Sequence, residues 1–322
     1  MKAIIVDKAQ KLHWREVAAP SYAADQILVD IHASAVNRAD LLQRAGHYPP
    51  PPGASTYMGL EMSGVICAVG PQVKNWKVGD RVLALLSGGG YAEQVALPAA
   101  HLLPLPNGWD FTTGAAVPEV FLTAFVNLFL EAQLAPGEVA LVHGGASGVG
   151  TAAIQLARAA GSRVLATAGT ATKVERCIQL GAELAVNYRE CDFSEAIFEH
   201  CDGVDVVLDI NAADYLDRNV RLLKHKGRLI FIALLSGSRA ELDLGQVLAK
   251  RLRLVGSTLR SRPDAEKSTI INAFFERFWP LLVKGDIQPV IETIFPIERV
   301  DEAQQMLAEN RNIGKVILKV RD

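Results

Sequence analysis

The sequence predicts an α/β protein in which a doubly wound parallel sheet is inserted into a split, β-rich domain. Three observations predict this class. The chain has 322 residues, which at ~150 residues per domain favours two domains. Its first hundred residues contain short apolar or β-branched runs bounded by Gly, Pro or Asp, which is typical of strands. From about residue 118, strands and helices alternate, which is typical of a parallel sheet.

The first domain is expected to consist mainly of strands. They are predicted at residues 2–6, 27–35, 62–69, 81–85 and 91–97. One helix is predicted over residues 38–44, because Asn37 can cap its start and Gly46 can end it. The proline run at residues 49–52 then predicts extended chain.

The second domain is expected to be a sheet of six parallel strands covered by helices on both faces. Its strands are predicted at residues 139–142, 163–167, 184–187, 204–208, 228–232 and 252–257, with helices at 149–160, 172–180 and 215–223 between them. Residues after 262 predict a long helix at 270–283, two short strands, a helix and a last strand at 315–320. We expect this tail to return to the first domain, so the predicted boundaries are 1–118, 119–261 and 262–322.

Composition excludes several classes of function. The net charge of −2 gives no overall basic field for a nucleic acid or an anionic membrane. No apolar run reaches the ~18 residues of a membrane-spanning helix, and the first residues read as a strand rather than a signal peptide. The four cysteines are scattered without a CxxC pair, which favours reduced thiols. We therefore expect a soluble cytoplasmic protein.

A glycine-rich loop is the most specific signal in the chain. It reads His-Gly-Gly-Ala-Ser-Gly-Val-Gly over residues 143–150, follows a predicted strand and opens a predicted helix. Small residues there let a backbone approach a pyrophosphate, and the helix N-terminus offers free N–H groups. The loop therefore predicts a dinucleotide site. Ser147 stands where the usual motif has glycine; its hydroxyl can face the cofactor, or it can simply cap the helix.

The segment after the second strand of this sheet favours NADPH over NADH. An NAD site normally carries Asp or Glu there to bind the adenosine ribose, whereas residues 164–173 contain no acid. A carboxylate would repel a 2′-phosphate, while hydroxyl groups and Lys173 would attract one. Tyr188, after the third strand, can add a phenolic O–H; Lys173 could alternatively be an ordinary solvated residue.

No metal or nucleophile site is predicted. The β-rich domain offers Cys67 and dispersed histidines without metal-ligand spacing, and no GxSxG motif is present. A hydride-transfer enzyme would then need an organic hydrogen-bond donor to polarise its acceptor. The candidate catalytic residues are Tyr48, Asn37 and Ser147.

Several motifs resemble zinc-independent quinone oxidoreductases of the medium-chain dehydrogenase/reductase superfamily. These include Asn37-Arg38-Ala39-Asp40, Arg44-x-Gly46-x-Tyr48-Pro49, Gly59-x-Glu61-x-Ser63-Gly64, Gly79-Asp80-Arg81-Val82 and the glycine-rich loop, in the order of the family. The resemblance spans essentially the whole chain. It implies a GroES-like catalytic domain, a Rossmann domain and NADPH in the cleft between them. It also implies a homodimer in which the sixth strands, 252–257, of two Rossmann sheets pair edge to edge, removing exposed edges.

The resemblance also assigns residues to the site. Asn37 and Tyr48 fall at active-site positions. Cofactor-binding positions are Thr123, Gly144, Gly145, Ala146, Ser147, Gly148, Val149, Gly150, Gly169, Thr170, Lys173, Tyr188, Asn211, Ala233, Leu234, Leu235, Thr258, Leu259, Arg260 and Asn312. Relatives often carry small or amide residues where this chain has Leu234 and Leu235, so only backbone groups are expected to hold the carboxamide there.

Together these features predict an NADPH-dependent reductase of a quinone, with an ortho-quinone favoured. The nearest alternative is reduction of an α,β-unsaturated carbonyl (an alkenal, enone or enoyl thioester), because the same hydride chemistry and fold serve both. A more distant alternative is a crystallin-like or RNA-binding protein, which the charge of −2 argues against. The expected partner is a small quinone or related carbonyl compound, with no nucleic acid and no membrane.

Overall fold

The computed structural model describes residues 1–321, and these divide into two compact units. The first unit comprises Met1–Leu122, Leu259–Lys284 and Pro289 onward, and the second comprises Thr123–Thr258 with Gly285–Gln288. The predicted boundaries lie four and three residues from the first two crossings, and the two crossings at either side of Gly285–Gln288 were not predicted. The first crossing falls inside one helix, α3 (Pro118–Phe125), where no loop composition marks it.

The first unit is built on β-sheets, as predicted. A two-stranded sheet pairs β1 (Lys2–Val6) with β2 (Leu12–Glu16). A seven-stranded sheet has the order β14-β15-β3-β4-β5-β7, with β6 also pairing β3. Its strands are β3 (Gln26–Val36), β4 (Glu61–Val69), β5 (Arg81–Leu85), β6 (Gln94–Pro98), β7 (Leu102–Pro104), β14 (Ile291–Pro296) and β15 (Lys315–Lys319).

Helices complete the first unit. The α-helices are α1 (Arg38–Arg44), α2 (Phe111–Ala115), α9 (Asp264–Lys284) and α10 (Val300–Ala308), and two 3₁₀ turns are η1 (Ala99–His101) and η4 (Ile297–Arg299). The C-terminal tail does return to this unit, since β15 lies between β14 and β3. Only one strand, not two, separates α9 from α10.

The second unit is a Rossmann fold. Its six strands are all parallel, in the order β10-β9-β8-β11-β12-β13. They are β8 (Val139–Val142), β9 (Arg163–Ala168), β10 (Leu184–Asn187), β11 (Val204–Asp209), β12 (Leu223–Phe231) and β13 (Arg253–Gly256). The strand order reverses between β8 and β11, and such switch points bind ligands in doubly wound sheets.

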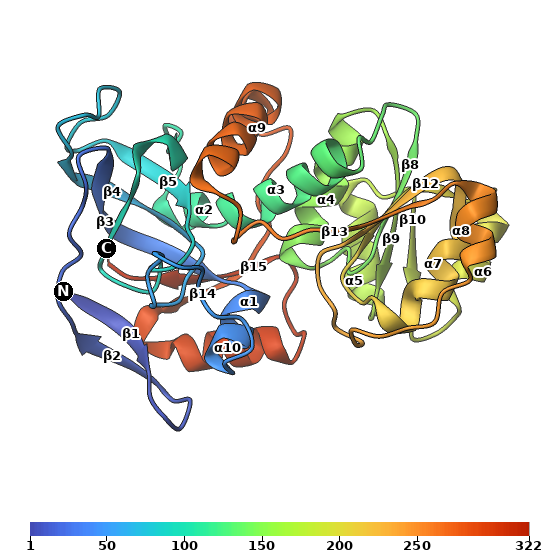
Figure 1. The fold of residues 1–322 in the computed structure, drawn as a ribbon, viewed down its shortest axis with the longest axis horizontal. Coiled ribbons are helices and arrows are strands. Elements are labelled where there is room, and N and C mark those ends of the chain that lie inside the picture. The colour runs from blue at the N-terminus through green and yellow to red at the C-terminus, as the bar shows by residue number, and fades with distance from the viewer. Residues whose placement is uncertain (322) are drawn as a thin grey trace. The chain divides into compact units, whose positions relative to one another are not determined.

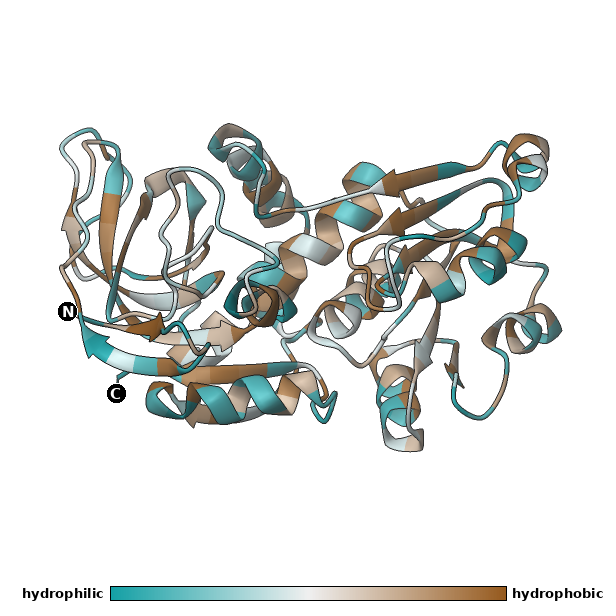
Figure 2. Ribbon diagram, turned by 60° about the horizontal axis from the view of Figure 1, so that its bottom comes forward, coloured by the Kyte–Doolittle hydropathy of each residue, from teal (hydrophilic) through white to brown (hydrophobic). Residues whose placement is uncertain are grey.

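Helices cover both faces of this sheet. Figure 1 shows α4 (Gly148–Ala159) and α5 (Ala171–Leu180) on one face and α6 (Phe193–His200), α7 (Leu216–Leu222) and α8 (Leu244–Lys250) on the other. A 3₁₀ turn, η3 (Ala213–Tyr215), and a π-helical segment, η2 (Val126–Glu131), complete the unit. Because the sheet is covered twice, its strands are mostly hydrophobic, whereas the helices carry hydrophilic residues on one side (Figure 2).

One helical stretch of the described residues, Phe111–Glu131, is long and apolar enough to cross a membrane. It is 78% buried inside the protein, so it is a core helix. The expectation that no run reaches this length therefore needs correction. Its composition is apolar because it packs among the protein's own side chains, not because it faces lipid.

Candidate functional site

The glycine-rich loop connects β8 to α4 in a conformation that only small residues permit. Gly144 has φ of +65°, and a Cβ on Gly150 would lie 2.2 Å from the Gly144 carbonyl oxygen. Ser147 is the N-cap of α4: its Oγ accepts a hydrogen bond from the Gly150 N–H at 3.0 Å. Its own hydroxyl proton remains a donor, so the capping role and a role toward a ligand coexist.

A buried histidine anchors this loop from beneath. The Nε2 of His143 lies 2.8 Å from the Asn219 amide oxygen, and its Nδ1 lies 3.0 Å from the Thr167 hydroxyl. Because an amide oxygen can only accept, Nε2 carries the proton and Nδ1 accepts. Burial lowers the pKa of His143, so the ring stays neutral. The Thr167 hydroxyl also accepts from the Gly144 N–H at 3.4 Å, which ties the loop to β9.

The turn after β9 can hold a phosphate group. Thr170 caps α5 and accepts from the Lys173 N–H at 3.3 Å. Tyr188 and Arg189 lie over Gly169: a Cβ there would be 2.6 Å from the Tyr188 hydroxyl and 3.4 Å from Arg189 Nε. The structure thus brings Gly169, Thr170, Lys173 and Tyr188 to one turn. It adds Arg189, which the sequence argument missed although it follows Tyr188 directly.

Asp209 organises the next loop at the carboxyl edge of this sheet. It ends β11 and accepts hydrogen bonds from the N–H groups of Asn211 at 2.7 Å and Ala212 at 3.1 Å. The Asn211 carbonyl oxygen accepts from the Ser236 hydroxyl at 2.7 Å, just after the Ala233–Leu235 stretch. Leu234 is 56% exposed and Leu235 50% exposed, so both side chains are accessible rather than packed.

The other predicted cofactor residues divide between the units. Thr123 and Thr258 belong to the second unit, and Leu259, Arg260 and Asn312 belong to the first. Asn312 is buried, and its amide donates to the Gly314 carbonyl oxygen at 2.7 Å. That contact explains its position without a ligand, so a cofactor role for Asn312 stays a prediction.

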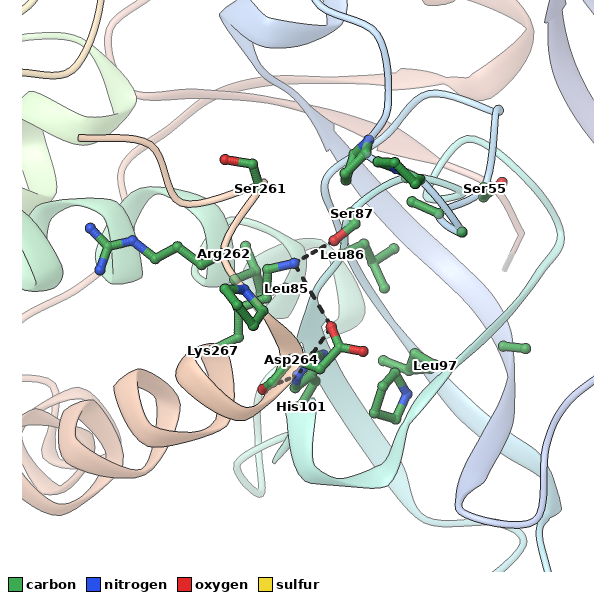
Figure 3. A pocket seen from close by; sticks show the side chains of 18 of the residues that line it. Ser55, Leu85, Leu86, Ser87, Leu97, His101, Ser261, Arg262, Asp264 and Lys267 are labelled. Carbon is green, nitrogen blue, oxygen red and sulfur yellow. Dashed lines mark hydrogen bonds and ion pairs between the residues drawn. The ribbon is translucent and has the colours of Figure 1, made fainter. Parts of the chain in front are cut away.

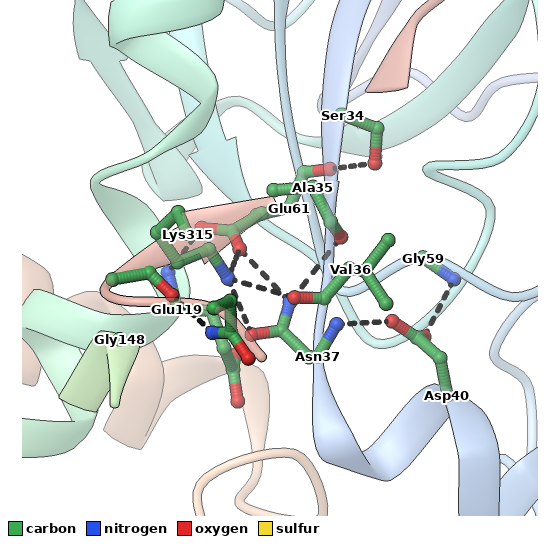
Figure 4. A network of polar contacts seen from close by, with 12 residues as sticks. Ser34, Ala35, Val36, Asn37, Asp40, Gly59, Glu61, Glu119, Gly148 and Lys315 are labelled. Atoms are coloured by element: carbon green, nitrogen blue, oxygen red, sulfur yellow. Dashed lines mark hydrogen bonds and ion pairs between the residues drawn. The ribbon is translucent and has the colours of Figure 1, made fainter. Parts of the chain in front are cut away.

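In the first unit, a buried polar network connects the end of β3 with the starts of β4 and β15 (Figure 4). Lys315 Nζ lies 2.7 Å from Glu61 Oε1 and donates to Asn37 Oδ1 at 2.7 Å. The Asn37 amide donates to Glu61 Oε1 at 2.8 Å and to the Ala35 carbonyl oxygen at 3.4 Å. Both N–H bonds of the Asn37 amide are therefore used, which leaves it no donor for an acceptor molecule. Asn37 positions the network instead.

Asp40 extends this network toward α1. It accepts from the Asn37 N–H at 2.8 Å, the Gly59 N–H at 3.1 Å and the Tyr91 hydroxyl at 2.9 Å. Burial raises the pKa of Asp40 to about 6, although these hydrogen bonds act in the opposite direction. The Asn37–Asp40 motif thus fixes the start of α1 and the loop at Gly59.

Glu119 stands beside this network in the first turn of α3. Its N–H donates to Glu61 Oε2 at 2.8 Å, and Figure 4 shows it next to Lys315 and Glu61. Burial, and then the charge of Glu61, raise the pKa of Glu119 to about 8. The sequence argument missed Glu119. The available signal was a single carboxylate between residues 114 and 130 of an otherwise apolar stretch.

Tyr48 is held by Arg260. The guanidinium carbon lies 5.3 Å from the centre of the Tyr48 ring, and Nη1 donates to the Tyr48 carbonyl oxygen at 3.3 Å. Arg260 also donates to the Gln43 side chain at 2.7 Å and to the Ser87 carbonyl oxygen at 2.8 Å. Arg260 is only 3% exposed, so it fixes the Tyr48 loop more than it reaches out to a ligand.

A pocket of about 460 Å³ lies in the first unit, and Ser87, which contacts Arg260, is one of its lining residues. Figure 3 shows Lys267 and Ser87 pointing toward each other, with Asp264 and His101 nearby. Lys267 Nζ donates to Ser87 Oγ at 2.6 Å and is 3.9 Å from Asp264 Oδ1. Neither Tyr48 nor Asn37 lines the pocket; it connects to Tyr48 through Ser87 and Arg260.

The donor set of the first unit does not fit a zinc ion. Zinc prefers Cys and His ligands, whereas the residues meeting here are Glu61, Asn37 and Lys315. The Lys315 ammonium already occupies the position from which a cation would neutralise Glu61. Within residues 1–321, no group of three or more His, Cys, Asp or Glu side chains could hold a metal ion.

Known protein families match segments in both structural units of the chain. Residues 23–107 match the family model "Alcohol dehydrogenase GroES-like domain", and residues 148–275 match "Zinc-binding dehydrogenase". Human quinone oxidoreductase is 34% identical, over 94% of this chain and 92% of that protein. Synaptic vesicle membrane protein VAT-1 homolog from mouse is 31% identical, over 96% of this chain and 80% of that protein.

Solved structures add two further relatives. The quinone oxidoreductase from Thermus thermophilus, solved also as a complex with NADPH, matches with a TM-score of 0.84 and 31% identity over 99% of this chain and 100% of that one. The CurK enoyl reductase matches with a TM-score of 0.86 and 27% identity over 99% of this chain and 98% of that one.

Proposed function

The chain belongs to the medium-chain dehydrogenase/reductase superfamily of NAD(P)-dependent oxidoreductases, and from that premise we propose that it is a zinc-independent, NADPH-dependent quinone reductase. Similarity to human and Thermus thermophilus quinone oxidoreductases supports the acceptor class. We further propose that an ortho-quinone is the favoured acceptor and that the enzyme is a cytoplasmic homodimer.

The proposal of NADPH rests on the turn after β9. The described residues of this turn carry no carboxylate. Arg189 Nε lies close to Gly169, and Thr170 and Lys173 follow Gly169 at the start of α5, where the Lys173 N–H donates to the Thr170 hydroxyl. These groups would hold a 2′-phosphate, with Tyr188 adding its phenolic O–H. The glycine-rich loop and the N-terminus of α4 would hold the pyrophosphate. When bound, NADPH supplies the hydride.

The observation that carries a metal-free mechanism is the donor set of the first unit. Lys315 lies 2.7 Å from Glu61, so an ammonium group already neutralises this carboxylate. Polarising an acceptor oxygen then falls to neutral hydrogen-bond donors, as in an oxyanion site. Tyr48 is the best-placed of the predicted residues, because its ring is clamped by Arg260 and no described residue bonds its hydroxyl. Ser147 is the second donor.

The test is NADPH oxidation by chelator-treated protein offered an ortho-quinone and an α,β-unsaturated aldehyde in parallel. We expect turnover of the quinone to be at least ~10-fold faster, and replacing Tyr48 by Phe to lower kcat by ~10². Loss of all activity after chelation would contradict the metal-free mechanism. Equal turnover with NADH would contradict the cofactor assignment.

One observation favours a second candidate, reduction of an activated C=C bond. The CurK enoyl reductase shares the whole fold with this chain, and hydride transfer to carbon uses the same cofactor chemistry. Faster turnover of the unsaturated aldehyde in the same assay would select this function. The fold and the cofactor would then stand, and only the acceptor would change.

A further inference from the structure

One buried polar atom close to Tyr48 has no assigned role. Among the described residues, Oε2 of Glu119 is fully buried and has no hydrogen-bond partner. A buried polar group left unpaired costs about 1–3 kcal/mol, so each such group calls for an explanation. The residue as a whole is only partly buried, although this oxygen is not exposed.

Burial keeps Glu119 neutral at physiological pH despite the cationic groups nearby. Glu61 on β4 and Asp40 on α1 raise its pKa, while Lys315 on β15 and Arg260 after β13 lower it. Lys315 is already paired with Glu61, and Arg260 with the Tyr48 loop. Burial therefore prevails, and the pKa is about 8. At pH 7 Glu119 carries a proton and is a donor that lacks an acceptor.

Glu119 also lies near the residues that the proposed function assigns to the acceptor. Its charge acts on the hydroxyl of Tyr48 and on the side chains of Arg260 and Lys267. Tyr48 itself is a poor acid, because burial and the charge of Glu119 raise its pKa above the ordinary value. Efficient proton donors have a pKa near the working pH, and of these neighbours only Glu119 does.

We propose that Glu119 is the proton donor of the reaction: its carboxyl O–H binds the acceptor oxygen and transfers its proton to that oxygen. This inference rests on the proposed function. The Glu119 O–H bond breaks and an O–H bond forms on one acceptor oxygen, while a C–H bond of the reduced nicotinamide would break and its hydrogen, with both electrons, would bond to the acceptor. The acceptor is thereby reduced by two electrons and the cofactor oxidised. Glu119 is left as a carboxylate and regains a proton from water after the product leaves.

The first experiment compares the wild-type protein with Glu119→Gln and Glu119→Asp in the NADPH–quinone assay. Gln keeps the shape and a hydrogen-bond donor but cannot supply a proton, so we expect kcat to fall at least ~10²-fold with KM for NADPH nearly unchanged. Wild-type kcat should fall as pH rises through about 8, where Glu119 loses its proton. This fall in kcat at alkaline pH should be absent in Glu119→Gln and should occur at a different pH in Glu119→Asp. Glu16→Gln, an exposed residue of β2, is the matched control.

The second experiment needs no turnover. Infrared spectroscopy of the wild-type protein at pH 7 should show a protonated-carboxyl band that titrates near pH 8, is missing in Glu119→Gln, and shifts when a hydroquinone product is added. Absence of the band would overturn the inference even if the variant failed to fold. Full activity of Glu119→Gln, or an unchanged fall in its kcat at alkaline pH, would overturn it as well. A wild-type protein that reduced no quinone would instead defeat the proposed function, and the proton-donor role with it.

Discussion

At the level of single residues, the proposed selectivity for NADPH gives a main role to the Lys173 ammonium at the start of α5. Lys173→Ala should raise KM for NADPH by at least ~10-fold and leave KM for NADH nearly unchanged, because only NADPH carries the 2′-phosphate. Steady-state kinetics with both cofactors measure this. Arg176→Ala, three residues further along α5 where Arg176 bonds Gln179, is the control. An equal effect on both cofactors would show that Lys173 does not bind the phosphate.

The burial of Glu119 should also lower the free energy of unfolding at neutral pH, because the pKa of Glu119 in the folded protein is higher than the ordinary value of 4.5. Between about pH 4.5 and 8 the unfolded chain loses the carboxyl proton while the folded protein keeps it. The free energy of unfolding is therefore highest below about pH 4.5 and falls as pH rises through about 8. At about 1.36 kcal/mol per pKa unit, the penalty at pH 7 is up to ~3 kcal/mol. Glu119→Gln should therefore raise Tm at pH 7 to 8 and have little effect at pH 4.5. Calorimetry at both pH values tests this, and a Tm lowered at pH 8 would contradict a protonated Glu119.

Residue roles were only partly predictable from the sequence. The glycine-rich loop reveals its function because its spacing is tied to one local geometry. Asn37 does not: its motif marks the site, but only the structure shows that Glu61 and Lys315 occupy its amide. Those partners lie 24 and 278 residues away along the chain. No local pattern encodes such contacts.

At the level of helices and strands, the glycine-rich loop between β8 and α4 has no room for a side chain at Gly150, the last of its four glycines. Gly150→Ala would place a Cβ 2.2 Å from the Gly144 carbonyl oxygen, so the loop must shift and α4 must move off the sheet. We expect NADPH binding to weaken at least ~10-fold, since the backbone donors would leave the pyrophosphate. Fluorescence titration with NADPH measures this. Gly245→Ala in α8 is the control, because a Cβ there would contact only the side chain of Asp243, the N-cap of that helix; this variant should bind NADPH as the wild type does. Unchanged NADPH binding by Gly150→Ala would contradict the assignment of the loop.

Elements with a strong period or a clear terminal signal were predicted well. The six strands of the parallel sheet and helix 38–44 were found because buried strands and capped helices carry local signatures. The strand β2 and the helical stretch at residues 111–131 were not. β2 (Leu12–Glu16) is half polar and owes its strand pairing to β1. The helical stretch has few polar residues to reveal a helical period, because most of it is buried.

For the molecule as a whole, the division into a β-rich part and an inserted parallel-sheet part followed from the change in secondary-structure pattern near residue 118, and the resemblance implied that the first part is GroES-like. The sequence could not locate the crossing, because it falls within α3 between residues 122 and 123. A helix shared by two units has no composition change at their boundary. Whether the cofactor lies between the two units stays a prediction.

Oligomeric state is the remaining property of the whole chain, and the open edge of the Rossmann sheet bears on it. β13 ends the strand order, and within residues 1–321 it pairs only with β12. An unpaired edge favours addition of a second strand. The Ser257 N–H donates to the Phe231 carbonyl oxygen on β12, so by alternation the Gly256 N–H faces away from β12, toward the open side.

Gly256→Pro would therefore remove an outward-facing donor and leave the bonds to β12 in place. If two copies pair through β13, this variant should sediment mainly as a monomer at micromolar concentration, whereas Gly256→Ala, which keeps the N–H and meets no atom within 4 Å, should remain a dimer. NADPH binding should be equal in both, since the glycine-rich loop lies on another strand. Dimers of Gly256→Pro as stable as those of Gly256→Ala would place the contact elsewhere. The exposed Leu244 and Leu248 of α8 would then be the next surface to change.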